Sequence, residues 1–486
     1  MMTSLPDTTA SPGTTTVTAP SSKKPCVRQG FNVLICTVLV AMTYLSIHSD
    51  VISVTPNIAQ DVALPAASDD TGRSEIDDVA ILPKSVMSEV DDVAILPKPA
   101  RSKINDVAVL PTSVMSEIGG FKRKPGGPCQ EKTRLAYIKV HKAGSTTVLY
   151  IFQRFGYRRH LHFVLPSRRD VNIGWPYLMK KEDYLQPIPG RPFDMLVDHT
   201  VYNREIFRNL LPNSTVYLTI VREPYSHLQS VINFFRLTGR YGMPKDDPGK
   251  FFLRSPAELE RTYFQSDENK RTPFSKTRNF MAYDLGIPVA LSEDEDYVRD
   301  YIAELDRDFL LVMVLEYFDE SLVLLKRYMC WQLTDILYEV QNSLDYTNKG
   351  TDRLSQKLRD AHKNWSKADY MLYQHFNRTL WEKVANEGSD FYSEVKQFKY
   401  LNRVTSQFCI RHGKADASRQ KVLKATAWNK RFVVDSNFCR LLNMKAPEYR
   451  RALKERYCQD VKTTIPASRH MELCTRFKGQ REQLSV

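Results

Sequence analysis

The chain has 486 residues, of which 42% are hydrophobic and 26% are charged. These values are ordinary for a globular protein and exclude a chain that is disordered throughout. The formal net charge is +13, and most of the excess lies in residues 401–486, which hold 19 Lys or Arg against 7 Asp or Glu. A basic region indicates an acidic partner, such as a phosphorylated cofactor, an anionic glycan, a lipid headgroup or nucleic acid; a solvated basic surface explains it equally well.

The first predicted element is an uncharged run of 17 residues at 31–47, FNVLICTVLVAMTYLSI. This length is sufficient for a transmembrane helix. Lys23, Lys24 and Arg28 precede the run, and Asp50 is the nearest charge after it. The positive-inside rule therefore predicts a cytosolic, disordered tail at 1–30 and a translocated remainder. A cleaved signal peptide is the alternative, and the long polar leader without a clear cleavage site disfavours it.

A repeat with a period of 14 residues follows the apolar run. Residues 76–83 (IDDVAILP) recur at 90–97 (VDDVAILP) and at 104–111 (INDVAVLP). The proline in each copy argues against one long helix. We interpret residues 48–128 as an extended stem that ends in the linker FKRKPGGP at 121–128.

The cysteines and glycosylation motifs after the apolar run agree with an oxidising compartment. An even number of cysteines is compatible with disulfides, although their pairing does not follow from the sequence. These cysteines are Cys129, Cys330, Cys409, Cys439, Cys458 and Cys474. No CxxC pair is present, so we expect no zinc site. Sequons at Asn213, Asn364 and Asn377 add weak support.

Short apolar strands alternate with helical segments from residue 129 onward. The predicted strands are 135–140, 193–197, 215–221 and 309–315. The predicted helices are 145–155, a segment that starts at Pro224, and 319–330, with a mainly helical stretch at 346–398. This alternation predicts an α/β fold in which helices flank a parallel sheet. We assign 129–400 to this domain and 401–486 to a small, basic, cysteine-containing subdomain.

The strongest local motif is KVHKAGSTT at residues 139–147, between a predicted strand and a predicted helix. α/β sheets bind anions at this position, where the amides of the first helical turn and the helix dipole attract a phosphate. Gly144 allows close backbone approach, and Lys142 adds a positive charge. The candidate binding residues are Lys142, Ala143, Gly144, Ser145, Thr146 and Thr147. The lysine precedes the only glycine, unlike in a Walker A loop, and we expect no metal; a charged turn without a ligand is the alternative.

A second motif, VREPYSHLQS, occupies residues 221–230. Arg222 ends a predicted strand, and its guanidinium can hold a phosphate with two hydrogen bonds. Pro224 suits the first turn of the following helix. Ser230 lies about two turns along that helix, where its hydroxyl can reach the same phosphate. Together the two motifs predict a ligand that carries two separate phosphates.

These two motifs resemble the elements with which sulfotransferases bind 3′-phosphoadenylyl sulfate (PAPS). With NFMAYDLG at 279–286 and FNRTLW at 376–381, the chain resembles the galactose-3-O-sulfotransferase family over about residues 130–400. The resemblance implies a P-loop-like sulfotransferase fold and a Golgi enzyme anchored as a single-pass type II protein with a lumenal catalytic domain. It implies that the glycine loop binds the 5′-phosphosulfate and that Arg222 and Ser230 bind the 3′-phosphate. The repeats and the basic region lie outside the resemblance.

Sulfuryl transfer also needs a base that takes the proton of the acceptor hydroxyl. His199 follows the predicted strand at 193–197 and is our candidate, because a neutral imidazole accepts a proton near neutral pH. A structural or sugar-binding histidine is the alternative reading. The rivals for this role are Glu205, Asp198 and His162. His141 adjoins Lys142, but adjacency in a loop more often reflects geometry than proton transfer. Lys142 is the second catalytic candidate, because a cation stabilises the charge that develops on the leaving oxygen.

The predicted activity is PAPS-dependent sulfation of the 3-hydroxyl of a terminal galactose on a glycolipid or glycoprotein. Sulfation of a glycosaminoglycan sugar is the second reading, which the basic region favours slightly. A membrane-tethered glycan-binding protein without catalysis is the third. We expect the membrane and a galactose-terminated acceptor as partners, and no nucleic acid. The sequence does not predict an oligomeric state.

Overall fold

A computed structural model describes residues 129–167, 172–265, 274–339, 354–412 and 418–464, all within one compact unit that spans 108–486. The predicted cytosolic tail, the apolar run at 31–47 and the repeats lie outside the described residues. Within the described ranges, no helix is both long and apolar enough to cross a membrane.

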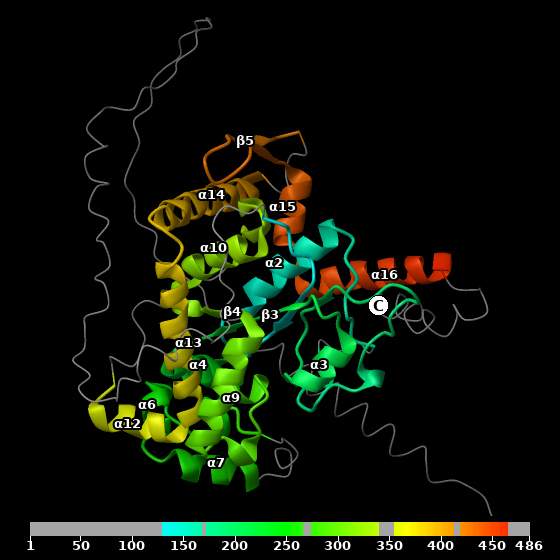
Figure 1. The fold of residues 1–486 in the computed structure, drawn as a ribbon. Coiled ribbons are helices and arrows are strands. Elements are labelled where there is room, and N and C mark those ends of the chain that lie inside the picture. The colour runs from blue at the N-terminus through cyan, green and yellow to red at the C-terminus, as the bar shows by residue number, and fades with distance from the viewer. Residues whose placement is uncertain (1–128, 168–171, 266–273, 340–353, 413–417, 465–486) are drawn as a thin grey trace, which may run out of the picture. The chain divides into compact units, whose positions relative to one another are not determined.

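A four-stranded parallel sheet lies at the centre (Figure 1). Its strands are β1 (Leu135–Ile138), β2 (Met195–Leu196), β3 (Val216–Val221) and β4 (Phe309–Val314), in the order β2-β1-β3-β4. The predicted strands are confirmed, although the second is short. Strands buried on both faces read as continuous apolar runs, and all of β1 and β2 is buried here. Because every pair is parallel, the carboxyl ends meet at one edge.

Helices flank the sheet, as the alternating pattern predicts (Figure 1). The segments before β4 include α2 (Ser145–Arg158), α3 (Arg204–Leu210), α4 (Pro224–Phe234), α5 (Leu237–Arg240), α6 (Pro248–Phe252), α7 (Pro256–Gln265), α8 (Phe280–Asp284) and α9 (Glu295–Asp308). After β4 follow α10 (Phe318–Met329), α11 (Leu333–Ile336), α12 (Gln356–Trp365), α13 (Lys367–Ala385) and α14 (Phe391–His412). Helices α9, α10 and α13 all contact β4, which explains its burial.

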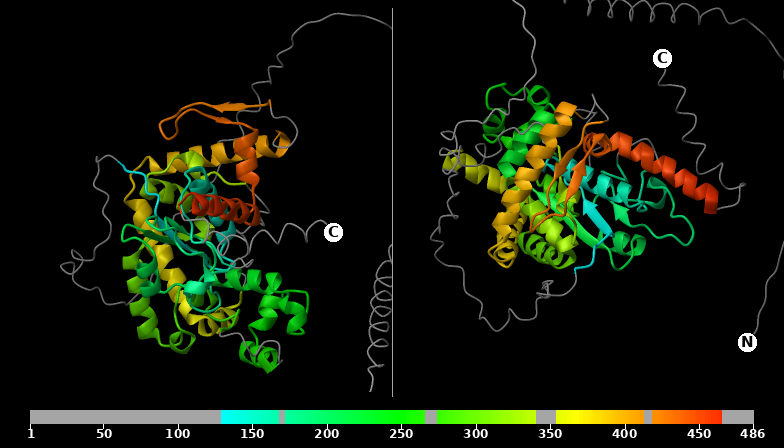
Figure 2. Two further views of the ribbon diagram at one scale, coloured as in Figure 1. Left: turned by 90° about the vertical axis from the view of Figure 1, so that its right-hand side faces the viewer. Right: turned by 90° about the horizontal axis from the view of Figure 1, so that it is seen from above.

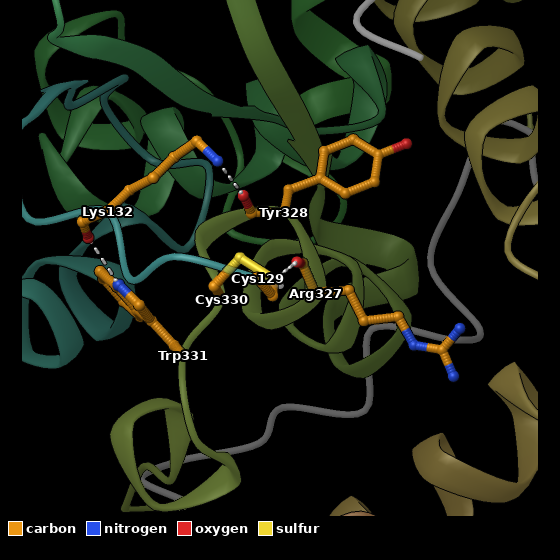
Figure 3. The surroundings of a disulfide bond; sticks show 6 residues. All are labelled: Cys129, Lys132, Arg327, Tyr328, Cys330 and Trp331. Carbon is orange, nitrogen blue, oxygen red and sulfur yellow. Dashed lines mark hydrogen bonds between the residues drawn. A yellow bond between two sulfur atoms is a disulfide. The ribbon is translucent and has the colours of Figure 1, made fainter. Parts of the chain in front are cut away.

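A disulfide joins the start of the domain to the end of α10. Cys129 is bonded to Cys330, 201 residues further along the chain (Figure 3). Two hydrogen bonds accompany it: Lys132 Nζ donates to the Tyr328 carbonyl at 3.1 Å, and Trp331 Nε1 donates to the Lys132 carbonyl at 2.8 Å. These contacts fix the segment that leads directly into β1.

The C-terminal region is built from α14, a two-stranded hairpin and two helices. Helix α14 runs continuously across residue 400. The hairpin pairs β5 (Lys421–Leu423) with β6 (Phe432–Val434) and is followed by α15 (Ser436–Asn443) and α16 (Ala446–Thr464). A disulfide between Cys409 and Cys439 ties α14 to α15, and Cys458 is also disulfide-bonded. Helix α16 packs against α2 (Figure 2), so this region contacts the α/β fold directly.

Candidate active site

The glycine loop between β1 and α2 adopts backbone conformations that suit an anion site. Lys142 and Gly144 have φ angles of 57° and 73°. The left-handed φ of Gly144 strains any other residue, and an added Cβ atom would lie 2.5 Å from Leu315 Cδ1, so the Leu315 side chain would have to move. The first turn of α2 has no acidic residue and its N-cap makes no side-chain hydrogen bond. The Thr147 amide donates to the Gly144 carbonyl at 3.2 Å. The amides of Ser145 and Thr146 are therefore the first-turn donors that suit an anion.

Arg222 and the glycine loop lie at the same edge of the sheet. Arg222 is only 6% exposed at the end of β3, and its Nη1 donates to the Lys142 carbonyl oxygen at 3.0 Å. Burial, followed by repulsion from the Arg222 guanidinium, lowers the pKa of Lys142. The Lys142 amine lies over the Phe234 ring at 3.7 Å from its centroid. The parallel sheet thus brings Lys142 and Arg222, 80 residues apart in the chain, to the same edge. A ligand with two phosphates requires such a pair of cations.

The other predicted ligand-binding residues line the same loop and helix α4. Ala143 and Ser145 are buried, Thr147 is half-buried and Thr146 is exposed. Ser230 is half-buried on α4. The N-terminus of α4 is closed, because the Glu223 carboxylate accepts from the backbone N–H groups of Tyr225 and Ser226 at 3.0 and 2.7 Å. The two helices that follow the motifs therefore differ: the start of α2 is open to an anion and that of α4 is not.

His199, the predicted base, lies in a cationic cluster near the glycine loop. Its Nε2 is 2.6 Å from Lys139 Nζ, and its ring stacks on His141 with centroids 3.9 Å apart. Burial, then the positive charge of Lys139 and of His141, holds the pKa of His199 well below its usual range. Burial lowers the pKa of Lys139 itself to about 8. His199 is therefore neutral near pH 7, which is the protonation state that a base requires.

His141 has the contacts of an oriented base, which the sequence analysis did not credit. Its Nδ1 lies 2.8 Å from Asp284 Oδ2, and its backbone N–H donates to the same oxygen at 2.7 Å. Trp175 Nε1 donates to Asp284 Oδ1 at 2.9 Å, and His227 Nε2 donates to the His141 carbonyl at 2.9 Å. A carboxylate at one ring nitrogen orients the imidazole, stabilises the imidazolium and leaves the second nitrogen to accept a proton.

The remaining rivals for the base lie in other settings. Asp198 is 1% exposed and forms an ion pair with Arg450 of α16, with Nη2 2.8 Å from Oδ1. His162 is buried, and its Nδ1 donates to the Pro192 carbonyl at 3.1 Å. Glu205 is exposed on α3. Of these three residues, only Asp198 adjoins His199 in the chain.

A pocket of about 670 Å³ is lined by chain neighbours of the histidine cluster, and not by the cluster itself or by the glycine loop. Pro176 and Tyr283 line it, and they are the chain neighbours of Trp175 and Asp284. The other lining residues come mainly from α3 and from the segments around α8 and α9: Leu178, Val201, Tyr202, Asn203, Arg204, Glu205, Arg208, Asn209, Gly286, Ile287, Pro288, Tyr297 and Tyr301. Tyrosine rings and polar side chains together suit a sugar better than a nucleotide phosphate.

Comparison with known proteins identifies the family. The model of the galactose-3-O-sulfotransferase family matches residues 27–433. The chain belongs to the galactose-3-O-sulfotransferase family. It is 32% identical over 288 residues to galactose-3-O-sulfotransferase 2 of Homo sapiens, covering 58% of this chain and 69% of that protein. It is 31% identical over 292 residues to galactosylceramide sulfotransferase of Homo sapiens, covering 60% and 67%.

The resemblance inferred from the motifs is thereby confirmed, and the chain is a carbohydrate sulfotransferase by family. A third relative, galactose-3-O-sulfotransferase 3 of Bos taurus, is 32% identical over 266 residues, or 54% of this chain and 60% of that protein. The family match includes the glycine loop, Arg222, His141, His199 and Asp284 and ends before α15 and α16. Among the described residues, no group of His, Cys, Asp or Glu could hold a metal ion.

Lys139, Trp175, Asp284 and Arg450 also belong to the site, and the sequence patterns do not predict them there. Asp284 lies within the stretch NFMAYDLG at 279–286, which carries part of the family resemblance, so that stretch contains a signal for it. Lys139 belongs to the first motif but was treated as the end of a strand. Arg450 reaches Asp198 across 252 residues, and no local pattern predicts such a contact.

Proposed function

We propose that this protein transfers a sulfuryl group from PAPS to the 3-hydroxyl of a terminal galactose on a glycolipid or glycoprotein. Family membership supports the reaction, and the names of the relatives support galactose as the acceptor sugar. The observation that carries the proposal is the hydrogen bond between Arg222 and the Lys142 carbonyl, because it joins the two phosphate-binding motifs at one edge of the sheet. A P-loop-like sulfotransferase fold agrees with the parallel sheet and the open start of α2.

In this proposal the donor lies between the glycine loop and Arg222. The first-turn amides of α2 and the side chains of Lys142, Ser145, Thr146 and Thr147 hold the 5′-phosphosulfate, while Arg222 and Ser230 hold the 3′-phosphate. PAPS supplies the activated sulfuryl group. The ammonium of Lys142 stabilises negative charge on the leaving phosphate oxygen. Catalysis then depends mainly on positioning and electrostatics, as in phosphoryl transfer.

The stacked pair of His141 and His199 supplies the base. His199 is the residue that the sequence favours, and its low pKa keeps it neutral. The Asp284 carboxylate favours His141, since Lys139 Nζ already occupies His199 Nε2. Separate His141→Ala and His199→Ala variants identify the base. The variant that lacks the base should lose about 10²–10⁴-fold in kcat, and the variant that lacks the other histidine should lose less. Near-normal rates in both variants would remove the pair from this role.

We propose the pocket of about 670 Å³ as the galactose site. Asn209 is exposed and lines it, so Asn209→Trp fills the pocket without disturbing the core. This change should raise KM for a galactoside by about tenfold or more, because a blocked pocket loses part of its binding energy, while KM for PAPS stays the same. Equal changes in the KM for the galactoside and the KM for PAPS would show that the galactoside binds outside this pocket.

Two experiments test the activity itself. Full-length protein and radiolabelled PAPS should label a panel of β-galactosides, and Lys142→Ala should abolish the labelling without loss of the fold. Label on heparan-type chains alone would instead support glycosaminoglycan sulfation, which the basic charge of residues 401–486 favours. A protein that binds galactosides and labels none would be the non-catalytic glycan-binding protein.

We also propose a Golgi location with a type II anchor at 31–47 and a lumenal catalytic domain. The uncharged run preceded by Lys23, Lys24 and Arg28 supports this orientation. The disulfides Cys129–Cys330 and Cys409–Cys439 agree with an oxidising lumen. Protease treatment of sealed Golgi vesicles should leave residues 129–464 intact; digestion of this region without detergent would contradict the orientation.

A further inference from the structure

Helix α16 lies beyond the residues that match the family, yet it is packed as part of the domain. One stripe of the helix is buried at a spacing of four residues: Tyr449, Leu453, Tyr457 and Val461. Residues four apart lie on the same face of a helix. This face of α16 therefore packs against the rest of the domain.

Polar contacts fix where α16 lies on the domain. Arg456 Nη1 donates to the Tyr157 carbonyl of α2 at 2.9 Å, and its guanidinium lies 4.3 Å from the centroid of the Tyr157 ring. Tyr457 donates its hydroxyl proton to the Gln186 carbonyl at 2.9 Å. Helix α16 thus runs beside α2, the helix whose start forms the anion site (Figure 2).

Arg450 extends from this fixed helix to the residue before His199. Its Nε and Nη2 lie 2.9 and 2.8 Å from Asp198 Oδ1. Arg450 is 9% exposed and Asp198 is 1% exposed. A carboxylate buried to this extent needs a cationic partner, because an uncompensated buried charge is strongly destabilising. The pair therefore holds the backbone from which His199 extends.

The same pair sets the charge around the histidine cluster. The charged groups around His199 are Lys139 and His141 from the loop after β1, Asp198 from its own segment and Arg450 from α16. Lys454 of α16 interacts with Asp198 and Arg450, and Asp284 lies behind His141. Asp198 raises the pKa of Lys139, whereas Arg450 lowers it. Arg450 also lowers the pKa of His199. Loss of Arg450 would therefore leave the Asp198 carboxylate to favour protonation of its neighbours.

We propose that α16 completes the catalytic centre and that Arg450 is a positioning residue, which acts through Asp198 on the Lys139–His199 pair. The catalytic part of this inference rests on the proposed sulfotransferase activity. The effect of Arg450 on the protonation and placement of His199 does not depend on that activity. A purely structural clamp is the competing account, in which Arg450 would change stability alone.

The test compares three variants of the full-length protein. Arg450→Met removes the charge and keeps most of the side-chain volume, whereas Arg450→Lys keeps the charge. Arg451→Met is the matched control, since Arg451 is the exposed neighbour on the same helix. The titration midpoint of each histidine is measured by mass spectrometry from hydrogen–deuterium exchange at the imidazole C2 position, and kcat, both KM values and the Kd for 3′,5′-ADP are measured in parallel.

We expect Arg450→Met to raise the titration midpoint of His199 by about one pH unit or more, because a neighbouring cation is lost. It should lower kcat by about tenfold to a hundredfold through misplacement of the cluster. The Kd for 3′,5′-ADP should stay within about twofold, because Arg450 is not part of the donor site. Arg450→Lys and Arg451→Met should keep the wild-type midpoint, and Asp198→Asn added to Arg450→Met should move the midpoint back.

An unchanged His199 midpoint in folded Arg450→Met would overturn the inference. So would equal losses in Arg450→Lys and Arg450→Met that follow their melting temperatures, since that pattern describes a structural clamp. If Arg450→Met does not fold, Asp198→Asn added to Arg450→Lys decides: loss of the carboxylate should lower the His199 midpoint relative to Arg450→Lys alone, and an unchanged midpoint would overturn the inference. If the variants shift the His199 midpoint as expected but the wild-type protein sulfates no galactoside, the proposed function is contradicted and the link between α16 and His199 still stands.

Discussion

Replacement of Arg222 by alanine tests the central geometric claim, that one ligand with two phosphates bridges two strands. Arg222 is 6% exposed and already donates one hydrogen bond to the Lys142 carbonyl. A buried guanidinium that binds a phosphate contributes about 2–4 kcal/mol, the scale for losing a charged hydrogen bond in a desolvated site. At about 1.4 kcal/mol per factor of ten, Arg222→Ala should weaken binding of 3′,5′-ADP by about 30-fold to 1,000-fold.

Calorimetric titration with 3′,5′-ADP at fixed ionic strength is the appropriate assay, since charged contacts depend on salt. Arg222→Lys keeps the positive charge but loses the two-pronged geometry, so its Kd should lie between those of wild type and Arg222→Ala. Arg451→Ala, on an exposed part of α16, is the control for a general loss of positive charge. A Kd for Arg222→Ala within about threefold of wild type, in a protein that melts normally, would refute a phosphate contact at this position.

Three further predictions concern the loop, the disulfide and pH. Gly144→Ala should weaken donor binding, because a left-handed φ of 73° and a contact of 2.5 Å with Leu315 Cδ1 oppose any Cβ; equal Kd values for 3′,5′-ADP would contradict this. Joint replacement of Cys129 and Cys330 by serine should lower the free energy of unfolding by about 5 kcal/mol in the chain-entropy model, measured by denaturant titration; a change below about 1 kcal/mol would exclude a stabilising role. Because burial lowers the pKa of Lys139 to about 8, the folded protein loses this proton while the unfolded chain keeps it up to about pH 10.5. Stability relative to Lys139→Met should therefore be lowest below pH 8 and rise by up to about 3 kcal/mol toward pH 10.5; equal pH dependence of the two proteins would contradict this.

The sequence predicts that the glycine loop and Arg222 lie at one edge of the sheet, because this placement follows from local patterns and one topological rule. The strands before the glycine loop and before Arg222 are short apolar runs, each followed by a helix signal. In a parallel sheet the carboxyl ends of such strands meet at one edge. β1 and β3 are indeed neighbours in register, with Ile138 opposite Thr219. Pro224 and Ser145 also mark helix starts that the structure confirms.

The histidine cluster was only partly predictable, because its contacts are long-range. His199 was identified from its place after a short strand, but Asp284 reaches His141 from 143 residues further along the chain. Arg450 reaches Asp198 from a helix that was assigned to a separate subdomain. The buried stripe of Tyr449, Leu453, Tyr457 and Val461 is visible in the sequence and predicts a packed helix. It does not indicate which surface that helix covers.

The unequal starts of α2 and α4 explain why the site needs a guanidinium as well as a helix dipole. The Glu223 carboxylate occupies the first amides of α4, and a negative charge there repels a phosphate. In the proposed donor site, this leaves Arg222 before the helix and Ser230 further along it to hold the 3′-phosphate. Glu223→Ala should lower the free energy of unfolding by about 1 kcal/mol through loss of the cap, while 3′,5′-ADP binding changes far less than in Arg222→Ala. If Glu223→Ala instead bound 3′,5′-ADP about tenfold more tightly, the phosphate would compete with Glu223 for the α4 amides. The 3′-phosphate site would then include the start of α4.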